Sequence, residues 1–403
     1  MKKAIILFIF IIIMGCSKEE PIPIINKQWI EDIKFIKQEL PVRHINLFSN
    51  ISQEDFDSEI ESLIKSIPQL EENEIICGLM KIFAKIGDSH TGIHNVYNLS
   101  KFNIAPVKYE VFDDGVYIVE IIESAKNYLK QKVVAINEQS IDEVNAKISD
   151  ILPHENDHFV RSSIPNFLRL YEILEALELI DSKNSYQLTL GSGEKIQVRG
   201  STSTSTILSS CYLPDKTPLY RQDNDINYWY KIIDHNIVYL QYNKCAEMYG
   251  ISFEEFIRQM FEELKNFVID KFVIDLRLNA GGSSLLMAPL IEELKKHGEL
   301  GGKIYGCIGC KTFSSGLINA IQIKKELGAI LLGEPTGGKP NHFGDIQELI
   351  LPNTELMMRY STKYFIEYPD NDISTLEPDY YVENNSFDCF NGIDSYIEFI
   401  KSN

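Results

Sequence analysis

The sequence predicts a mixed α/β protein of several domains, and three observations support this fold class. Residues 17–95 place apolar side chains at three- and four-residue steps, which is typical of amphipathic helices. Residues 96–200 combine short strand-like runs with helical stretches. From about residue 225 onward, apolar strands and helices alternate in a βαβαβ order. That order predicts a parallel sheet with right-handed crossovers.

Length and charge limit the possible functions. A chain of 403 residues is long enough for two or three domains. The formal net charge of −19 argues against nucleic acid or an anionic membrane surface as the main partner.

The N-terminus has the pattern of an export signal. After MKK comes the apolar run AIILFIFIIIM, which is too short to span a membrane but suits a secretory signal. Gly15 before Cys16 resembles the bacterial lipobox, and this resemblance implies cleavage before Cys16 and acylation of its thiol. We therefore expect residues 1–15 to be a lipoprotein signal peptide. The mature protein would be exported and lipid-anchored to the cell envelope, at the outer membrane or cell surface. An ordinary signal peptide with an incidental cysteine is the alternative.

The next two segments are predicted to be a helical domain at residues 16–95 and an α/β module at residues 96–200. QWIEDIKFIKQEL and EENEIICGLMKIFAKIG supply the helical periodicity of the first. In the second, GVYIVEII is strand-like and YQLTLGSGEKIQV predicts a hairpin with Gly-Ser-Gly at its turn. A long helical stretch is expected at roughly residues 157–180.

The last segment, residues 201–403, has the clearest pattern of strands and helices. FVIDLRL, KIYGCIG and AILLG predict three strands, and LLMAPLIEELKKHG and SSGLINAIQIKKELG predict the helices between them. The loop NAGGSS (279–284) follows the first strand, and KTFSSG (311–316) follows the second. Working groups collect beyond the carboxyl ends of parallel strands. We therefore expect these two loops to lie close together.

The residues of the two loops suit acyl transfer. Gly281 and Gly282 have no side chains, so their N–H groups can approach a developing oxyanion. If the hydroxyl of Ser314 attacked a carbonyl, the N–H of Ser315 would point near the same oxygen. A helix cap and a simple turn remain the structural alternatives for these residues.

A nucleophilic serine needs a base. His90 lies in GDSHTG at the end of a predicted helix. Lys339 and His342 lie in GEPTGGKPNHFG, just past the third strand and so at the same sheet edge. The residue pattern alone leaves the choice between them open.

Five segments together resemble the tail-specific, or C-terminal processing, serine peptidases and their tricorn-like relatives. In chain order they are KIGDSHTGI, KFVIDLRLNAGG, KTFSSG, GEPTGGKPNHFG and LEPDYYV. The resemblance covers most of residues 30–390 and is strongest in the last 150. It implies a ClpP/crotonase-like catalytic core at residues 201–403, a helical N-terminal region and a PDZ-like module. The implied activity is hydrolysis of peptide or protein substrates by Ser314, without a cofactor or metal.

The resemblance also bears on the base. The processing-peptidase branch pairs its serine with a lysine and a glutamine one turn later. Lys339 matches that lysine, but Phe343 stands where the glutamine is expected. The tricorn-like branch uses a histidine helped by a second serine, and Ser89 and His90 match this pair. We therefore favour His90 as the base, with Lys339 as the alternative.

The supporting acid of the tricorn-like branch lies shortly before the Pro-Asp block. Asp372 falls at about that place, and Asp370 is close enough to be the alternative. In the PDZ-like module the usual glycine-rich carboxylate-binding loop is not obvious. Capture of peptide C-termini by this module is therefore a hypothesis.

Two rival functions are left open. HENDH (154–158) satisfies the zinc-peptidase signature H-E-x-x-H. That signature requires a helix, and Pro153 with Asn156 favours a loop that leads into a helix from about Asp157. The other rival is a catalytically silent peptide- or ligand-binding surface lipoprotein of the same fold. The G-x-S-x-G elbow of lipase-like esterases is absent from the chain.

Overall fold

The structure is a computed structural model. It describes residues 23–93, 96, 102–202, 206–234, 236–300, 303–369 and 373–403. The expected signal peptide at residues 1–15, the expected lipidation site Cys16, and Asp370 and Asp372 lie outside these ranges. Among the described helices, none has the length and apolar character needed to cross a membrane.

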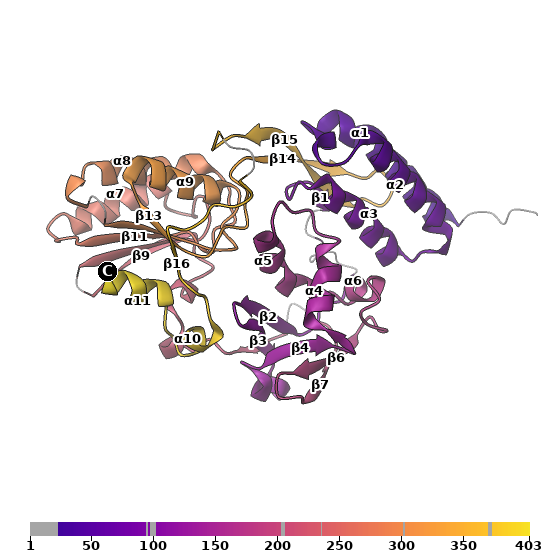
Figure 1. Ribbon diagram of the computed structural model, residues 1–403, viewed down its shortest axis with the longest axis horizontal. Helices are drawn as coiled ribbons and strands as arrows, with labels where there is room; N and C mark the ends of the chain where they lie inside the picture. The colour runs from indigo at the N-terminus through magenta and orange to yellow at the C-terminus, as the bar shows by residue number, and fades with distance from the viewer. Residues whose placement is uncertain are drawn as a thin grey trace, which may run out of the picture.

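Three helices form the N-terminal part of the molecule (Figure 1). They are α1 (Ile24–Arg43), α2 (Gln53–Ser66) and α3 (Glu72–Ile86). Trp29 of α1 and Phe83 of α3 are fully buried between them. α3 ends at Gly87, whose φ of +69° reverses the chain as C-terminal caps commonly do. The helix end therefore holds the residues that follow it, Asp88 to His90, at a fixed place.

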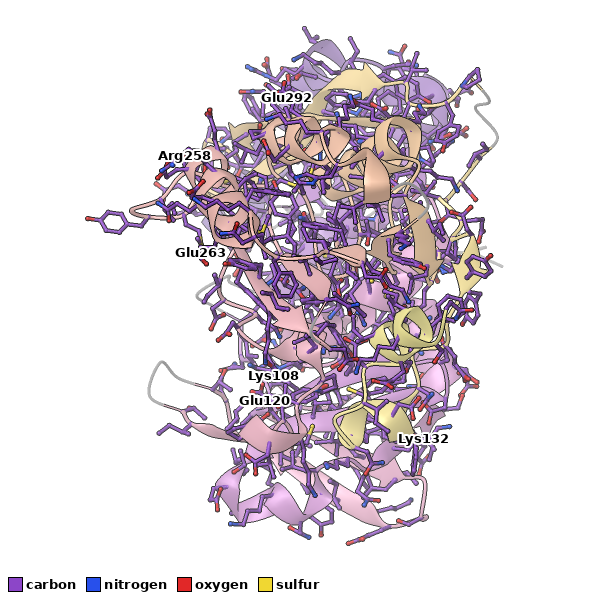
Figure 2. The ribbon with its side chains drawn as sticks, turned by 90° about the vertical axis from the view of Figure 1, so that its left-hand side faces the viewer. Lys108, Glu120, Lys132, Arg258, Glu263 and Glu292 are labelled. Carbon is purple, nitrogen blue, oxygen red and sulfur yellow. The ribbon has the colours of Figure 1, made fainter. Side chains whose placement is uncertain are left out.

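The second part of the chain is an antiparallel sheet with helices packed on it. The strand order is β2-β3-β4-β6-β7, with β5 beside β4 and β8 beside β3. On its exposed face Lys108 of β2 and Glu120 of β3 stand opposite each other and pair at 2.9 Å (Figure 2). The strands are β2 (Val107–Phe112), β3 (Gly115–Ile122), β4 (Lys132–Ile136), β5 (Gln139–Ser140), β6 (Ser185–Leu190), β7 (Lys195–Arg199) and β8 (Leu208–Ser210).

Three helices accompany this sheet: α4 (Ile141–Ser149), α5 (Asp157–Phe167) and α6 (Tyr171–Ala176). The helical stretch expected at roughly residues 157–180 is present as two helices, α5 and α6, and ends at Ala176. Leu170, between α5 and α6, forms a β-bridge with Ile104, and the helical hydrogen bonds stop there. Asn156 caps α5 by accepting a hydrogen bond from Phe159 N. HENDH is therefore a loop that leads into a helix, as the sequence indicates.

The C-terminal part contains a six-stranded sheet in the order β16-β13-β12-β11-β10-β9. All neighbouring pairs are parallel except β9 with β10, and Asp275 of β11 stands beside Cys307 of β12. The strands are β9 (Tyr228–Ile233), β10 (Ile237–Tyr242), β11 (Lys271–Asp275), β12 (Ile304–Ile308), β13 (Ile330–Gly333) and β16 (Tyr380–Tyr381). The predicted βαβαβ order and parallel sheet are confirmed.

Helices cover both faces of this sheet (Figure 1). One face packs against α7 (Phe253–Leu264), α8 (Ala288–Lys295) and α9 (Ser315–Leu327). The other packs against the C-terminal helix α11 (Ser395–Ser402), which follows the short α10 (Ser386–Phe390). Successive residues of β11 alternate between the two layers: Phe272 and Ile274 face the three helices, and Val273 faces α11. A sheet buried on both faces explains why its strands read as continuous apolar runs.

One hairpin leaves this core and joins the N-terminal helices. β14 (His342–Ile350) and β15 (Met357–Phe365) pair with each other, and β15 also pairs with β1 (Gly92–Ile93). Figure 1 shows both long strands beside α1. Asp32, fully buried in α1, accepts hydrogen bonds from the hairpin turn at Asn353 and Thr354. The hairpin thus ties the N-terminal helices to the loop that precedes it in the core.

Candidate active site

Ser314 stands at the start of α9 without acting as its cap. It occupies the N-cap position, yet its side chain makes no capping hydrogen bond. Its φ of +50° and ψ of −126° are unusual for a residue with a side chain and cost about 1–3 kcal/mol. Phe313 N donates to Asn279 O at 3.0 Å, and this bond holds the turn against the neighbouring loop. Ser314 is half-buried in the loop that follows β12, and its hydroxyl has no hydrogen-bond partner among the residues that the structure describes.

The Gly281-Gly282 loop lies directly against Ser314. A Cβ on Gly281 would be 2.9 Å from Ser314 Cβ, which is closer than carbon atoms normally approach. Ser315 Oγ donates to Gly282 O at 2.7 Å and links the two loops. The proximity predicted for the loops after β11 and β12 is therefore confirmed.

Two backbone N–H groups at this junction are available to an oxyanion. Gly281 N donates to Asn279 Oδ1 at 2.9 Å and is already engaged. Gly282 N and Ser315 N make no hydrogen bond to any residue in the described ranges. Of the two glycines predicted as oxyanion donors, Gly282 is therefore the one with a free N–H.

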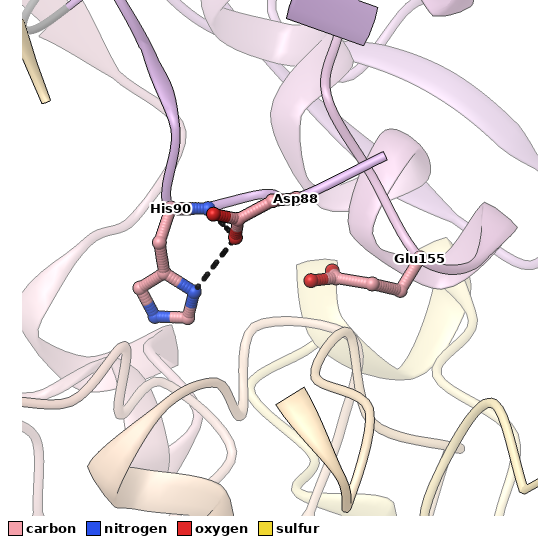
Figure 3. Close-up of side chains that lie close together, drawn as sticks. All are labelled: Asp88, His90 and Glu155. Carbon is pink, nitrogen blue, oxygen red and sulfur yellow. Dashed lines mark hydrogen bonds and ion pairs between the residues drawn. The ribbon is translucent and has the colours of Figure 1, made fainter. Parts of the chain in front are cut away.

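His90 lies over the residue that precedes Ser314. Its ring stacks on Phe313, with centroids 4.6 Å apart, and on His342 at 5.6 Å. The side chain is only 8% exposed. Neither ring nitrogen has a hydrogen-bond partner among the described residues. Nδ1 faces Asp88 Oδ1 at 3.8 Å, and the other nitrogen points away from Asp88 (Figure 3).

Asp88, which the sequence analysis did not select, is the acid facing His90. Its Oδ2 accepts from His44 Nε2 at 3.0 Å, from Thr91 Oγ1 at 2.5 Å and from Ser361 Oγ at 2.7 Å. Burial would raise the pKa of Asp88, but the hydrogen bond from His44 and its other neighbours lower it to about 2. The carboxylate is therefore ionised at neutral pH.

Burial also sets the protonation of His90. Loss of solvent lowers the pKa of His90 to about 4, although the charge of Asp88 opposes this change. The imidazole is neutral at pH 7 and has a lone pair that can accept a proton. Asp88 can then stabilise the imidazolium that forms.

Glu155 is the second acid that the sequence analysis missed. Its Oε1 accepts from Ser89 N at 3.2 Å, whereas its Oε2 and the hydroxyl of Ser89 are buried without a partner in the described residues. Burial, with the charge of Asp88, raises the pKa of Glu155 to about 7. Figure 3 shows its carboxyl group pointing towards Asp88 and His90. Glu155 is the glutamate of HENDH, and it joins Asp88 and His90 rather than the two histidines of its own motif.

The histidines of HENDH do not join this cluster. Nδ1 of His154 lies 2.6 Å from the backbone oxygen of Leu152. His158 lies in the first turn of α5. Within the described part of the chain, the potential metal ligands that gather are Asp88, His90 and Glu155.

Lys339 lies beside the site rather than in an ion pair. It lines a pocket of about 330 Å³ together with Glu155, His342 and Phe343. The side chain of Lys339 makes no hydrogen bond or ion pair with any residue in the described ranges. The ring of Phe343 packs at a tilt of 60° against that of Tyr364, with centroids 4.8 Å apart, and has no group that could orient an ammonium ion. The roles of Lys339 and of Asp372, which lies outside the described residues, stay predictions.

Comparison with known proteins supports the fold. No protein-family model matches the chain, and no curated protein matches its sequence. A structure of mature CPAF complexed with lactacystin aligns at a TM-score of 0.65 and 11% identity, covering 94% of this chain and 98% of that one. A crystal structure of mature CPAF aligns at 0.63 and 11% identity, covering 94% and 96%. The photosystem II D1 C-terminal processing protease aligns at 0.41 and 12% identity, covering 92% and 98%, a score too low to support an inference.

The chain therefore has the fold of CPAF over nearly its whole length. The predicted mixed α/β architecture, with its helical N-terminal region and several sheets, is confirmed.

Proposed function

We propose that this chain is a serine peptidase in which Ser314 is the nucleophile and His90 the general base. The observation that carries the proposal is the strained serine at the start of α9, whose hydroxyl caps nothing. The N–H groups of Gly282 and Ser315, which have no partner among the described residues, lie next to it. A buried neutral histidine stacks on the adjacent phenylalanine. These are the parts that acyl transfer requires.

The mechanism follows from these positions. His90 takes the proton of Ser314 as the serine oxygen attacks the peptide carbonyl. The N–H groups of Gly282 and Ser315 stabilise the oxyanion, and removal of one such donor typically lowers the rate about 100- to 1,000-fold. Asp88 stabilises the imidazolium. His90 then protonates the leaving amine, and water releases the acyl group from Ser314.

Substrate binding completes the arrangement. His90 and Ser314 share no hydrogen bond in this structure. Catalytic hydrogen bonds are often long in the free enzyme and tighten only in the substrate complex. We therefore infer that His90 approaches the hydroxyl of Ser314 when substrate binds.

The decisive experiment compares two serines that both stand at helix starts in the same domain. Ser252 caps α7 by accepting from Glu255 N, whereas Ser314 caps nothing. Full-length protein purified in detergent is incubated with a mixed peptide library, and cleavage is followed by mass spectrometry. We expect Ser314→Ala to abolish cleavage and leave the melting temperature nearly unchanged. Ser252→Ala should cleave normally and lose about 1 kcal/mol of stability.

Other outcomes would contradict the proposed role of Ser314. Cleavage by Ser314→Ala at the wild-type rate would remove the serine from the mechanism. If both proteins bind library peptides equally and cleave none, the chain is a binding protein of this fold. Lactacystin, which is bound in the CPAF structure, is a further probe for a covalent adduct on Ser314.

We also propose that the mature protein is exported and anchored by a lipid on Cys16. The basic start, the apolar run and the Gly15-Cys16 pair support this proposal. Labelling of cells with a fatty-acid analogue should mark the wild type but not Cys16→Ser. Equal labelling of the two proteins would contradict lipidation at this residue.

A further inference from the structure

A buried group of three potential metal ligands lies at the proposed base. The ligand atoms of Asp88, His90 and Glu155 all lie within 4.8 Å of one another. The side chain of His90 is 92% buried, and neither of its nitrogens has a partner in the described residues. Glu155 Oε2 is buried and unpartnered as well. A buried polar group without a partner typically costs about 1–3 kcal/mol, so a ligand that satisfies these atoms would gain that free energy.

We propose that Asp88, His90 and Glu155 bind one zinc ion, which blocks the general base. One imidazole nitrogen with two carboxylate oxygens is a ligand set that zinc accepts, with a fourth position left for water. Calcium and magnesium favour six or more oxygen ligands, which this group does not supply. Two carboxylates and one neutral imidazole also balance the charge of the ion.

To bind one zinc ion, the three ligand groups must move slightly closer together. Tetrahedral zinc ligands at about 2.0–2.2 Å from the metal lie roughly 3.3–3.6 Å apart. His90 Nδ1 and Asp88 Oδ1 are already at 3.8 Å. Glu155 supplies the remaining movement, because its long side chain comes from the loop before α5 and its carboxyl group already points at the other two (Figure 3).

Neighbouring side chains hold Asp88 in place, and a pocket connects the site with solvent. Three hydrogen-bond donors hold Asp88 Oδ2, from His44, Thr91 and Ser361. Within the described residues, Asp88 Oδ1 accepts one hydrogen bond, from His90 N, and lies 3.8 Å from His90 Nδ1. Such outer contacts orient metal ligands. The pocket of about 330 Å³ that Glu155 lines gives an ion access from solvent.

Metal binding and proton transfer compete for one lone pair. A neutral imidazole that gives the Nδ1 lone pair to zinc carries its only proton on Nε2. It cannot then accept the proton of Ser314. Zinc would therefore inhibit reversibly, and this consequence rests on the proposed function, whereas the binding itself does not.

The binding experiment does not depend on activity. Full-length protein is stripped with a chelator, exchanged into chelator-free buffer and titrated with zinc chloride in a calorimeter. We expect one zinc per chain, and at least about tenfold weaker binding by Glu155→Gln. The control His158→Gln removes the second histidine of HENDH and should bind as the wild type does. Circular dichroism checks that both variants are folded.

Two results would overturn the site. One is that folded wild-type protein binds no zinc. The other is that Glu155→Gln binds zinc as tightly as the wild type does. Loss of binding in His158→Gln would move the metal to HENDH and also exclude the site proposed here.

An activity measurement then separates this inference from the proposed function. Peptide cleavage by the wild type should fall at zinc concentrations that saturate the calorimetric site and return on addition of chelator. Cleavage without zinc binding would refute the metal site and keep the peptidase. Zinc binding by a protein that cleaves nothing would keep the site and refute the peptidase.

Discussion

Replacing Gly281 with alanine tests whether the glycine loop sets the position of Ser314. A Cβ at this position would lie 2.9 Å from Ser314 Cβ and 3.1 Å from Ser315 N. Carbon atoms are at their optimal separation at about 3.5–4.0 Å, so the serine must move by roughly 0.6–1.1 Å. A shift of about 1 Å at an active site can lower the rate about 100-fold. We expect a loss of this size in kcat/KM.

Backbone strain must be separated from this steric effect. Gly281 has a φ of +112°, which costs a residue with a side chain about 1–3 kcal/mol. Gly250 is a matched control, because its φ is +88° and a Cβ there would meet nothing within 4 Å. Both alanine variants should lose stability, but only Gly281→Ala should lose activity.

The assay measures two rates and one stability. Peptide cleavage and labelling of Ser314 by a fluorophosphonate report on the serine, and thermal melting reports on the fold. If folded Gly281→Ala reacts as fast as Gly250→Ala, the loop does not position Ser314 and the reasoning is refuted.

Three further predictions concern the base and one buried ion pair. Because burial lowers the pKa of His90 to about 4, kcat/KM should rise as the pH increases through about 4 and stay level towards 7; a rise centred near 6.5 would contradict a buried base. Lys339→Met should keep kcat/KM within about tenfold, whereas His90→Ala should lower it by about 100- to 10,000-fold; the reverse order would make Lys339 the base. Arg161→Met should lower the free energy of unfolding by about 3 kcal/mol in urea, because it leaves the buried Glu334 without its 2.5 Å partner. Arg43→Met removes an exposed pair and should leave the free energy of unfolding nearly unchanged; equal losses would mean that Glu334 does not need Arg161.

Local patterns predicted the elements of the core well. FVIDLRL, KIYGCIG and AILLG became β11, β12 and β13, since strands buried on both faces must be apolar throughout. Periodicity could not predict the break within the helical stretch at residues 157–180, because that break depends on the pairing of Leu170 with Ile104. In the β14–β15 hairpin, β15 has a partner more than 200 residues away in β1, and no local pattern indicates such a contact.

The residues of the candidate site also differ in whether local patterns could predict them. Ser314 and the two glycines follow neighbouring parallel strands, and the rule that such loops meet at one sheet edge is a property of the fold class. Their proximity could therefore be predicted. Asp88 was missed because a single acid carries no pattern, and Glu155 was missed because HENDH was weighed only as a zinc-peptidase signature. The meeting of the two acids depends on how the end of α3 packs against the loop before α5.

By itself, the sequence determined which elements form, their order in the core and which serine stands at the start of α9. These properties follow from hydrophobic periodicity and strand connectivity, which act over a few residues. Only the tertiary structure decided that Ser314 is strained and caps nothing, and that His90 stacks on Phe313 beside two acids. Backbone strain and buried charge depend on contacts between segments far apart in the chain, so they exist only once those segments have packed together.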